Sequence, residues 1–207
     1  MNYLIIGAPL SGKGTLSNLI TKHLQIPHIS MGDLLRNVAN GNNKYSEYIS
    51  NLMKEGKLIN DDLVKLILED RLNNADCKNG FVLDGYPRNL EQAETLESIV
   101  KIDKVIYVTV SETTVIKRLS HRFICPKCNI TYNTEIYNKN YCEKCNNLLT
   151  KRQDDNETTL LSRIKLFNET TFPVLNKYLK ENKLITISNE GDINEVFEEL
   201  KGKLDLW

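Results

Sequence analysis

The sequence has no excess charge of either sign, because 27 basic residues balance 27 acidic ones in a chain of 207. This balance argues against a protein that coats nucleic acid through positive charge. Long hydrophobic runs are also missing. The first apolar stretch, Tyr3 to Ile6, is far too short for the core of a signal peptide, and no other run approaches the length of a membrane span. We therefore expect a soluble, cytoplasmic protein that binds neither membrane nor nucleic acid.

Hydrophobic residues are not scarce, and at 41% of the chain they argue against intrinsic disorder. A chain of 207 residues can bury a real core, and it fits one domain with inserted subdomains better than two independent domains. Histidine is rare, and the three histidines do not gather into a candidate site. Any charged site must therefore be local and built from other residue types.

Strand-like and helix-like patterns alternate along the chain. After the first apolar run and a glycine-rich loop, Leu16, Leu19, Ile20 and Leu24 recur at helical spacing. Further strands are predicted at 80–85, 104–110 and 184–188, and further helices at 89–100, from about 112, from about 157, and at 193–204. This alternation predicts an α/β fold with a parallel sheet that helices cover on both faces.

Two segments do not fit the alternation. Residues 30–59 are mostly helical and polar with no strand candidate, and residues 122–155 hold the paired cysteines and show little helical periodicity. Both are interpreted as insertions on one core. That core would consist of residues 1–29, 60–121 and 156–207.

The stretch from Gly7 to Thr15, "GAPLSGKGT", lies between the first predicted strand and helix. Its glycines allow positive φ angles and close approach of backbone N–H groups to phosphate oxygens, while the helix that follows presents the positive end of its dipole. Lys13 would reach the terminal phosphates as a point charge. The usual motif has Ser or Thr directly after the lysine, whereas here Gly14 stands in that place and Thr15 comes one residue later. The stretch still predicts a nucleotide phosphate site.

Four of the five cysteines form two C-x-x-C pairs, Cys125 with Cys128 and Cys142 with Cys145. Two such pairs can supply four thiolates in the tetrahedral arrangement that zinc prefers. A closed site of this kind has no open coordination position, so the zinc would be structural. Two alternatives remain: disulfides, which a reducing compartment disfavours, and a zinc ribbon that binds nucleic acid.

Several motifs together resemble the adenylate kinases, which are nucleoside monophosphate kinases, in the long form with a zinc-bearing lid. They are "GAPLSGKGT", "SMGDLLR", "FVLDGYPRN" with Gln92, "RLSHR", the cysteine pairs and "RQDDNETTLLSR", and they span nearly the whole chain in order. The resemblance implies reversible, Mg²⁺-dependent transfer of the terminal phosphoryl group of ATP to AMP, giving two ADP. It also implies that segment 30–59 closes over AMP and segment 122–155 over ATP. We expect a monomer.

Residue roles follow from matching this chain to those motifs, and phosphoryl transfer calls for cations that converge on the phosphates. Asp84, at the end of a predicted buried strand, is the candidate for holding Mg²⁺ through its waters, with Asp33 second. Asp154 and Asp155 resemble lid-hinge aspartates that orient arginines. The implied catalytic residues are Lys13, Asp84, Arg36, Arg88, Arg122, Arg152 and Arg163. ATP would contact Gly7, Gly12, Lys13, Gly14, Thr15, Arg118 and Arg122, and AMP would contact Met31, Arg36, Ile59, Gly85, Arg88 and Gln92.

Three departures from the family pattern leave alternatives open. The family has glycine where Leu10 stands, threonine where Met31 stands, and a further lid arginine where Phe123 stands. A positive φ at Leu10 would cost about 1–2 kcal/mol. The alternatives are a nucleotide sensor or inactive relative with weak catalysis, and a kinase for another nucleoside monophosphate.

Overall fold

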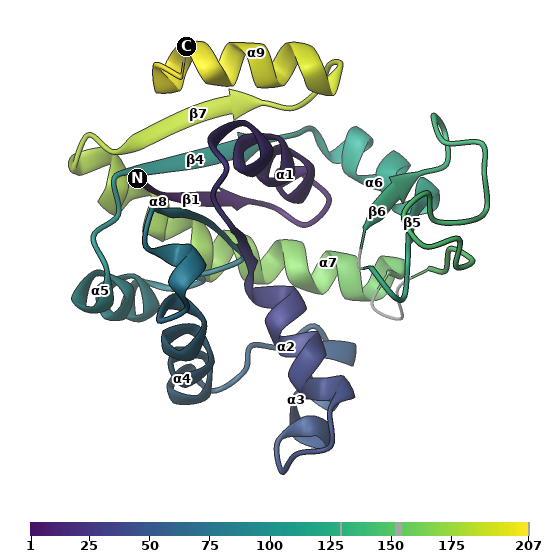
Figure 1. Ribbon diagram of the computed structural model, residues 1–207, viewed down its shortest axis with the longest axis horizontal. Helices are drawn as coiled ribbons and strands as arrows, with labels where there is room; N and C mark the ends of the chain where they lie inside the picture. Colours follow the sequence, from purple (N-terminus) through teal and green to yellow (C-terminus); the bar gives the residue numbers. More distant parts are fainter. Residues whose placement is uncertain (129, 152–154, 207) are drawn as a thin grey trace.

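A parallel sheet forms the centre of the protein. The computed structural model describes residues 1–128, 130–151 and 155–206, and within them the main sheet has five strands in the order β2-β3-β1-β4-β7. Neighbouring strands all run parallel, so their carboxyl ends share one edge, toward which the arrowheads point in Figure 1. The strands are β1 (Asn2–Gly7), β2 (His28–Ser30), β3 (Phe81–Asp84), β4 (Lys104–Thr109) and β7 (Leu184–Ser188).

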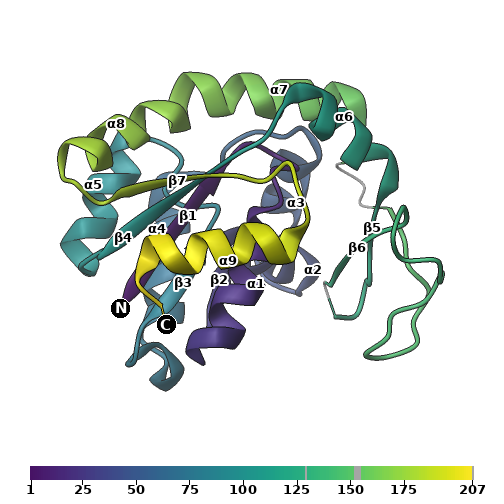
Figure 2. The same ribbon diagram turned by 90° about the horizontal axis from the view of Figure 1, so that it is seen from above.

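Helices cover both faces of this sheet. Successive side chains of a strand point to opposite faces, and apolar side chains on both faces are buried. In β1, Tyr3 and Ile5 belong to one buried cluster, whereas Leu4 and Ile6 belong to another. The first cluster is completed by α1 (Lys13–Leu24) and α9 (Ile193–Leu204), and the second by α4 (Asp61–Leu72), α5 (Leu90–Ile99) and α8 (Phe172–Lys180). Figure 2 shows α1 and α9 on one side of the sheet and α8 on the other. The predicted fold class is confirmed.

Two groups of elements stand away from the sheet in Figure 1. Helices α2 (Met31–Asn40) and α3 (Ser46–Lys54) pack against each other below the carboxyl edge. On another side, α6 (Glu112–His121) leads into an antiparallel pair, β5 (Arg122–Ile124) and β6 (Thr131–Asn133), and α7 (Glu157–Leu166) follows the cysteine-bearing segment. The carboxyl edge of the sheet therefore lies beside both groups.

Most predicted elements are confirmed to within a residue or two, including the strand at 184–188 and the helices at 89–100 and 193–204. The helix predicted from about residue 157 continues beyond α7 through a π-helical segment, η2 (Phe167–Thr171), into α8, where Pro173 lacks an N–H to donate. A short 3₁₀ helix, η1 (Ala75–Cys77), precedes β3.

The sequence reasoning missed strand β2. It has only three residues, too few to show an alternating pattern, and its pairing with β3 from His28–Val82 to Ser30–Asp84 identifies it. Because β2 ends where α2 begins, it brings the start of α2 to the carboxyl edge. None of the helices in the described ranges has the length and apolar character needed to span a bilayer.

Candidate active site

The glycine-rich loop joins β1 to α1 and opens at the carboxyl edge of the sheet. Gly12, the residue before α1, has a φ of 84°, which an L-residue with a side chain adopts only at a cost. A Cβ on Gly7 would lie 2.5 Å from the Ser11 hydroxyl and 2.8 Å from the Val108 carbonyl oxygen, so only glycine fits there. The first turn of α1 carries no acidic residue and has no side-chain cap. The N–H of Thr15 already donates to the Gly12 carbonyl oxygen at 3.0 Å, whereas the start of the helix before it presents N–H groups and the positive end of the helix dipole to an anion.

Leu10 adopts the left-handed conformation, with a φ of 64°, although its side chain disfavours it. That side chain is only 7% exposed and packs on Val115 of α6 and Leu160 of α7. The carbonyl oxygen of Leu10 accepts a 3.1 Å hydrogen bond from Nη1 of Arg118, and Nη2 of Arg118 donates to the Asn189 carbonyl oxygen at 2.7 Å. Packing and these hydrogen bonds hold the loop in its strained form.

Lys13, the first residue of α1, lies among the predicted cations. Burial lowers the pKa of its ammonium group to about 8, and the positive charges of Arg163, Arg88 and Arg122 add to that decrease, while the carboxylate of Asp84 opposes it. Like charges repel, so each of these cations makes the charged form of its neighbours less favourable. The clustering of these four cations therefore indicates a site that takes an anion.

Asp84 ends β3 and is 8% exposed. Burial by itself would raise the pKa of this carboxyl group, but Lys13, then His28 and Arg88, hold the pKa below its usual range. Its Oδ2 lies 3.7 Å from Nε2 of His28, whereas Oδ1 is buried with no hydrogen-bond partner among the described residues. An ionised carboxylate with one unsatisfied oxygen beside this glycine-rich loop fits a hydrated Mg²⁺ ion.

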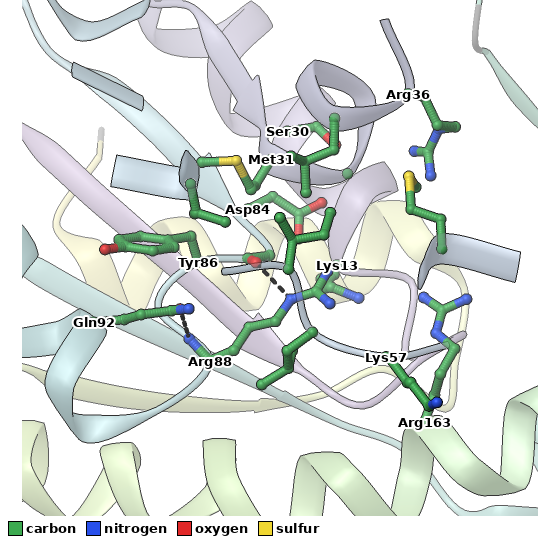
Figure 3. A pocket seen from close by; sticks show the side chains of 17 residues that line it. Lys13, Ser30, Met31, Arg36, Lys57, Asp84, Tyr86, Arg88, Gln92 and Arg163 are labelled. Atoms are coloured by element: carbon green, nitrogen blue, oxygen red, sulfur yellow. Dashed lines mark hydrogen bonds between the residues drawn. The ribbon is translucent and has the colours of Figure 1, made fainter. Parts of the chain in front are cut away.

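A cavity lies between the carboxyl edge and α2 and brings together many predicted residues. Figure 3 shows Gln92 and Tyr86 at one side of it, and the guanidinium groups of Arg36 and Arg163 toward the other. Arg88 reaches across between them, and its Nε donates to the Gly85 carbonyl oxygen at 2.9 Å. The predicted residues that line the cavity are Lys13, Met31, Arg36, Ile59, Asp84, Gly85, Arg88, Gln92 and Arg163.

Two predicted arginines are held by aspartates. Arg122, which opens β5, forms a two-pronged ion pair with Asp155, whose side chain is only 2% exposed; its Nε donates to Oδ2 at 2.7 Å. Arg36 donates through Nε and Nη2 to Asp33, with a 3.1 Å Nε–Oδ1 distance. Asp33 is thus engaged by Arg36, which leaves Asp84 as the better metal candidate.

Of the remaining predicted residues, two lie in the first turn of α1, and two lie outside the described residues. Thr15 is exposed in the first turn of α1. Gly14 lies beside Asp84, since a Cβ on it would be 3.6 Å from Oδ2. Arg152 and Asp154 lie outside the described residues.

The four paired cysteines come together as predicted. Their sulfur atoms all lie within 4.8 Å of one another, and none of the five cysteines forms a disulfide. Zn–S bonds of about 2.3 Å would place tetrahedral sulfur atoms about 3.8 Å apart, so a zinc ion fits after small shifts of the sulfur atoms. The backbone N–H of Cys128 donates to the sulfur of Cys125 at 3.3 Å, and the Tyr132 hydroxyl to that of Cys142 at 3.3 Å. Such donors stabilise thiolates.

Comparison with known proteins shows the family of this chain. Residues 5–183 match the family model described as adenylate kinase. The chain belongs to the adenylate kinase family. Among curated relatives, the adenylate kinases of Thermosipho africanus and Kosmotoga olearia are each 38% identical to it, with 97% and 99% of both chains covered. That of Clostridium kluyveri is 35% identical over 99% of this chain and 98% of the relative.

This adenylate kinase family member is accordingly a phosphotransferase of the nucleoside monophosphate kinase type, with nucleotides as substrates. Several residues that line its cavity escaped the sequence reasoning: Ser30, Gly32, Leu35, Met53, Lys57, Leu58, Val64 and Tyr86. Tyr86 could have been predicted from the sequence, because it lies between Gly85 and Arg88, which were both predicted to contact AMP. Met53 belongs to α3, and Lys57 follows that helix. Only the packing of α2 and α3 beside the sheet brings these two residues to the cavity.

Proposed function

We propose that this protein is an active adenylate kinase that transfers the terminal phosphoryl group of ATP to AMP, reversibly and with Mg²⁺, giving two ADP. One observation carries the proposal: cations from four different parts of the fold line one cavity at the carboxyl edge, beside the buried carboxylate of Asp84. They are Lys13 of α1, Arg36 of α2, Arg88 after β3 and Arg163 of α7.

The reaction needs no protein nucleophile, because a phosphate oxygen of AMP attacks the terminal phosphorus of ATP. The protein's part is to align the two phosphates and to stabilise negative charge that spreads over the transferred group. Arg88 and Arg36 would hold the AMP phosphate with planar guanidinium forks. Lys13 and Arg163 would face the transferred group, and Arg122, aimed by Asp155, would join them, as would Arg152 from the lid.

Mg²⁺ bound to ATP would neutralise charge on the phosphates, and Asp84 would hold its water ligands through the free Oδ1. No other described carboxylate with an unpartnered buried oxygen lines the cavity.

The two nucleotides would occupy adjoining sites. ATP would bind the loop through Gly7, Gly12, Lys13, Gly14 and Thr15, with Arg118 and Arg122 beyond it. Arg118 donates to the Leu10 and Asn189 carbonyl oxygens. These hydrogen bonds would hold its guanidinium group beside the loop, where it would contact the ATP adenine. AMP would bind among Met31, Arg36, Ile59, Gly85, Arg88 and Gln92.

We propose the same division of the chain that the sequence predicts: a core of 1–29, 60–121 and 156–207, an AMP-binding segment 30–59, and a lid 122–155. Closure of the lid would exclude water, so that AMP and not water receives the phosphoryl group. A structural Zn²⁺ on Cys125, Cys128, Cys142 and Cys145 would stabilise the lid, whose described strands are only three residues long. Free thiols and a thiolate zinc site suit a reducing, cytoplasmic location, and we propose a monomer.

A coupled assay with zinc-loaded protein, ATP and AMP tests the proposal. We expect ADP to form, with loss of most activity in Lys13→Ala. Lys22→Ala is the matched control, because Lys22 is an exposed lysine of the same helix and should leave turnover unchanged. Absence of ADP formation at any protein concentration would refute catalysis and favour a nucleotide sensor. Faster turnover of CMP or UMP than of AMP would favour a different monophosphate kinase.

A further inference from the structure

Asp61, the first residue of α4, holds the side-chain amide of Gln92. Oδ1 of Asp61 accepts a 2.5 Å hydrogen bond from Nε2 of Gln92, and Oε1 of Gln92 accepts a 2.8 Å hydrogen bond from the backbone N–H of Arg88. Gln92 lines the cavity and is 3% exposed. Asp61 contacts Gln92 but is not among the described residues that line the cavity.

Chemistry sets the orientation of this amide without ambiguity. An ionised carboxylate can only accept a hydrogen bond, and a backbone N–H can only donate one. If the amide of Gln92 turned by 180°, Oε1 would face the Asp61 carboxylate and Nε2 would face the Arg88 N–H. Both hydrogen bonds would become repulsive contacts, so the amide is held in one orientation.

Neighbouring contacts keep Asp61 itself in place. Its Oδ2 accepts from Nδ2 of Asn89 at 3.2 Å. The other side-chain atom of Asn89, Oδ1, accepts from the backbone N–H of Gln92 at 2.7 Å and caps the start of α5. Asn89 therefore links the Asp61 carboxylate to the start of α5, the helix that carries Gln92. Because the carboxylate is charged, its hydrogen bond restrains the Gln92 amide more firmly than a neutral acceptor would.

Amide orientation decides which purine can pair with Gln92. A 6-amino purine offers an N–H donor beside a ring-nitrogen acceptor, whereas a 6-oxo purine offers a carbonyl acceptor beside an N–H donor. An amide that turns freely pairs with either base. Because Asp61 and Arg88 already use one Nε2–H and one Oε1 lone pair, the second Nε2–H and the second Oε1 lone pair remain for the base. The donor and the acceptor of Gln92 therefore face the base in one fixed order.

We propose that Asp61 is a positioning residue for base selection: by fixing the Gln92 amide, it makes the cavity favour a 6-amino purine monophosphate, AMP, over a 6-oxo one, IMP. The proposal rests on the proposed function, since it takes the cavity to be the AMP site.

The test compares kcat/KM for AMP and for IMP, with ATP as donor, in wild type, Asp61→Asn and Asp62→Asn. An asparagine can rotate to meet a turned Gln92 amide with a donor, so D61N should lower the AMP-to-IMP ratio about tenfold or more, through a higher KM for AMP and an unchanged KM for ATP. Asp62 is exposed, in the same helical turn, and D62N removes the same charge, so it should leave the ratio unchanged. Asp61→Ala replaces D61N if the latter does not fold.

A double-mutant cycle separates positioning from general destabilisation. In a Gln92→Ala background, D61N should no longer alter the AMP-to-IMP ratio. A ratio within twofold of wild type in folded D61N, or an equal effect of D61N with and without Gln92, overturns the proposal. If wild type turns over neither nucleotide, the proposed function fails, and the ratio of AMP to IMP affinities by calorimetry on the same variants still decides the role of Asp61.

Discussion

Replacing Leu10 by glycine, the residue that the family pattern has there, should destabilise this protein. Leu10 combines two opposing features: a φ of 64°, and a side chain that is 7% exposed and packed on Val115 and Leu160. A side chain in the left-handed region costs about 1–2 kcal/mol. Truncation of a buried leucine costs about 2–5 kcal/mol, and the low end suits a cluster this small.

The magnitudes favour packing over strain. Leu10→Ala keeps the strain and loses the packing, so it should cost about 2–3 kcal/mol. Leu10→Gly regains roughly 1 kcal/mol of strain relief after its greater chain entropy is counted, for a net loss of about 1–2 kcal/mol. At roughly 2–4 °C per kcal/mol for a chain of this size, Tm should fall from wild type to L10G and further to L10A.

Thermal unfolding at constant zinc content measures this order. Gln25 is the matched control, because it has a φ of 55° at the end of α1 but is exposed. Gln25→Gly loses no packing and should raise stability by about 0.5–1 kcal/mol. An L10G protein with a Tm at or above wild type would show that the Leu10 side chain contributes nothing by packing, and would refute the reasoning.

Three further predictions concern the site. In the proposed site Lys13 holds phosphate as a cation, and its pKa is lowered to about 8, so kcat/KM for ATP should fall as the pH rises through about 8 in a pH profile. Asp84→Asn removes the charge that raises this pKa and should move the fall to lower pH. Asp155→Asn frees Arg122 from its buried ion pair and should lower kcat about tenfold by loss of orientation, as steady-state kinetics would show. Cys142→Ser should remove zinc, measured by metal analysis, and lower Tm, whereas Cys77→Ser, which changes a cysteine remote from the cluster, should keep zinc bound.

Much of the site could be read from local patterns, because its residues lie at the ends of strands or beside glycines. The glycine-rich loop follows β1, Asp84 is the last residue of β3, and Arg88 comes shortly after it. The cysteine spacing already brings the two sulfur atoms of each pair together. Such features depend on a few consecutive residues, and the sequence displays those directly. The fold class follows for the same reason, since alternating strands and helices leave few ways to bury both faces of a sheet.

The sequence by itself was enough to predict the α/β fold, the glycine-rich loop, the cations that line the cavity and the cluster of four cysteines. Only the tertiary structure decided what Leu10 does, since its left-handed backbone is compensated by α6 and α7, which come more than 100 positions later. It also decided that Asp61 faces Gln92 across 31 positions. Both are contacts between distant elements, and a pattern of neighbouring residues carries no record of which side chains the packing of helices on a sheet brings together.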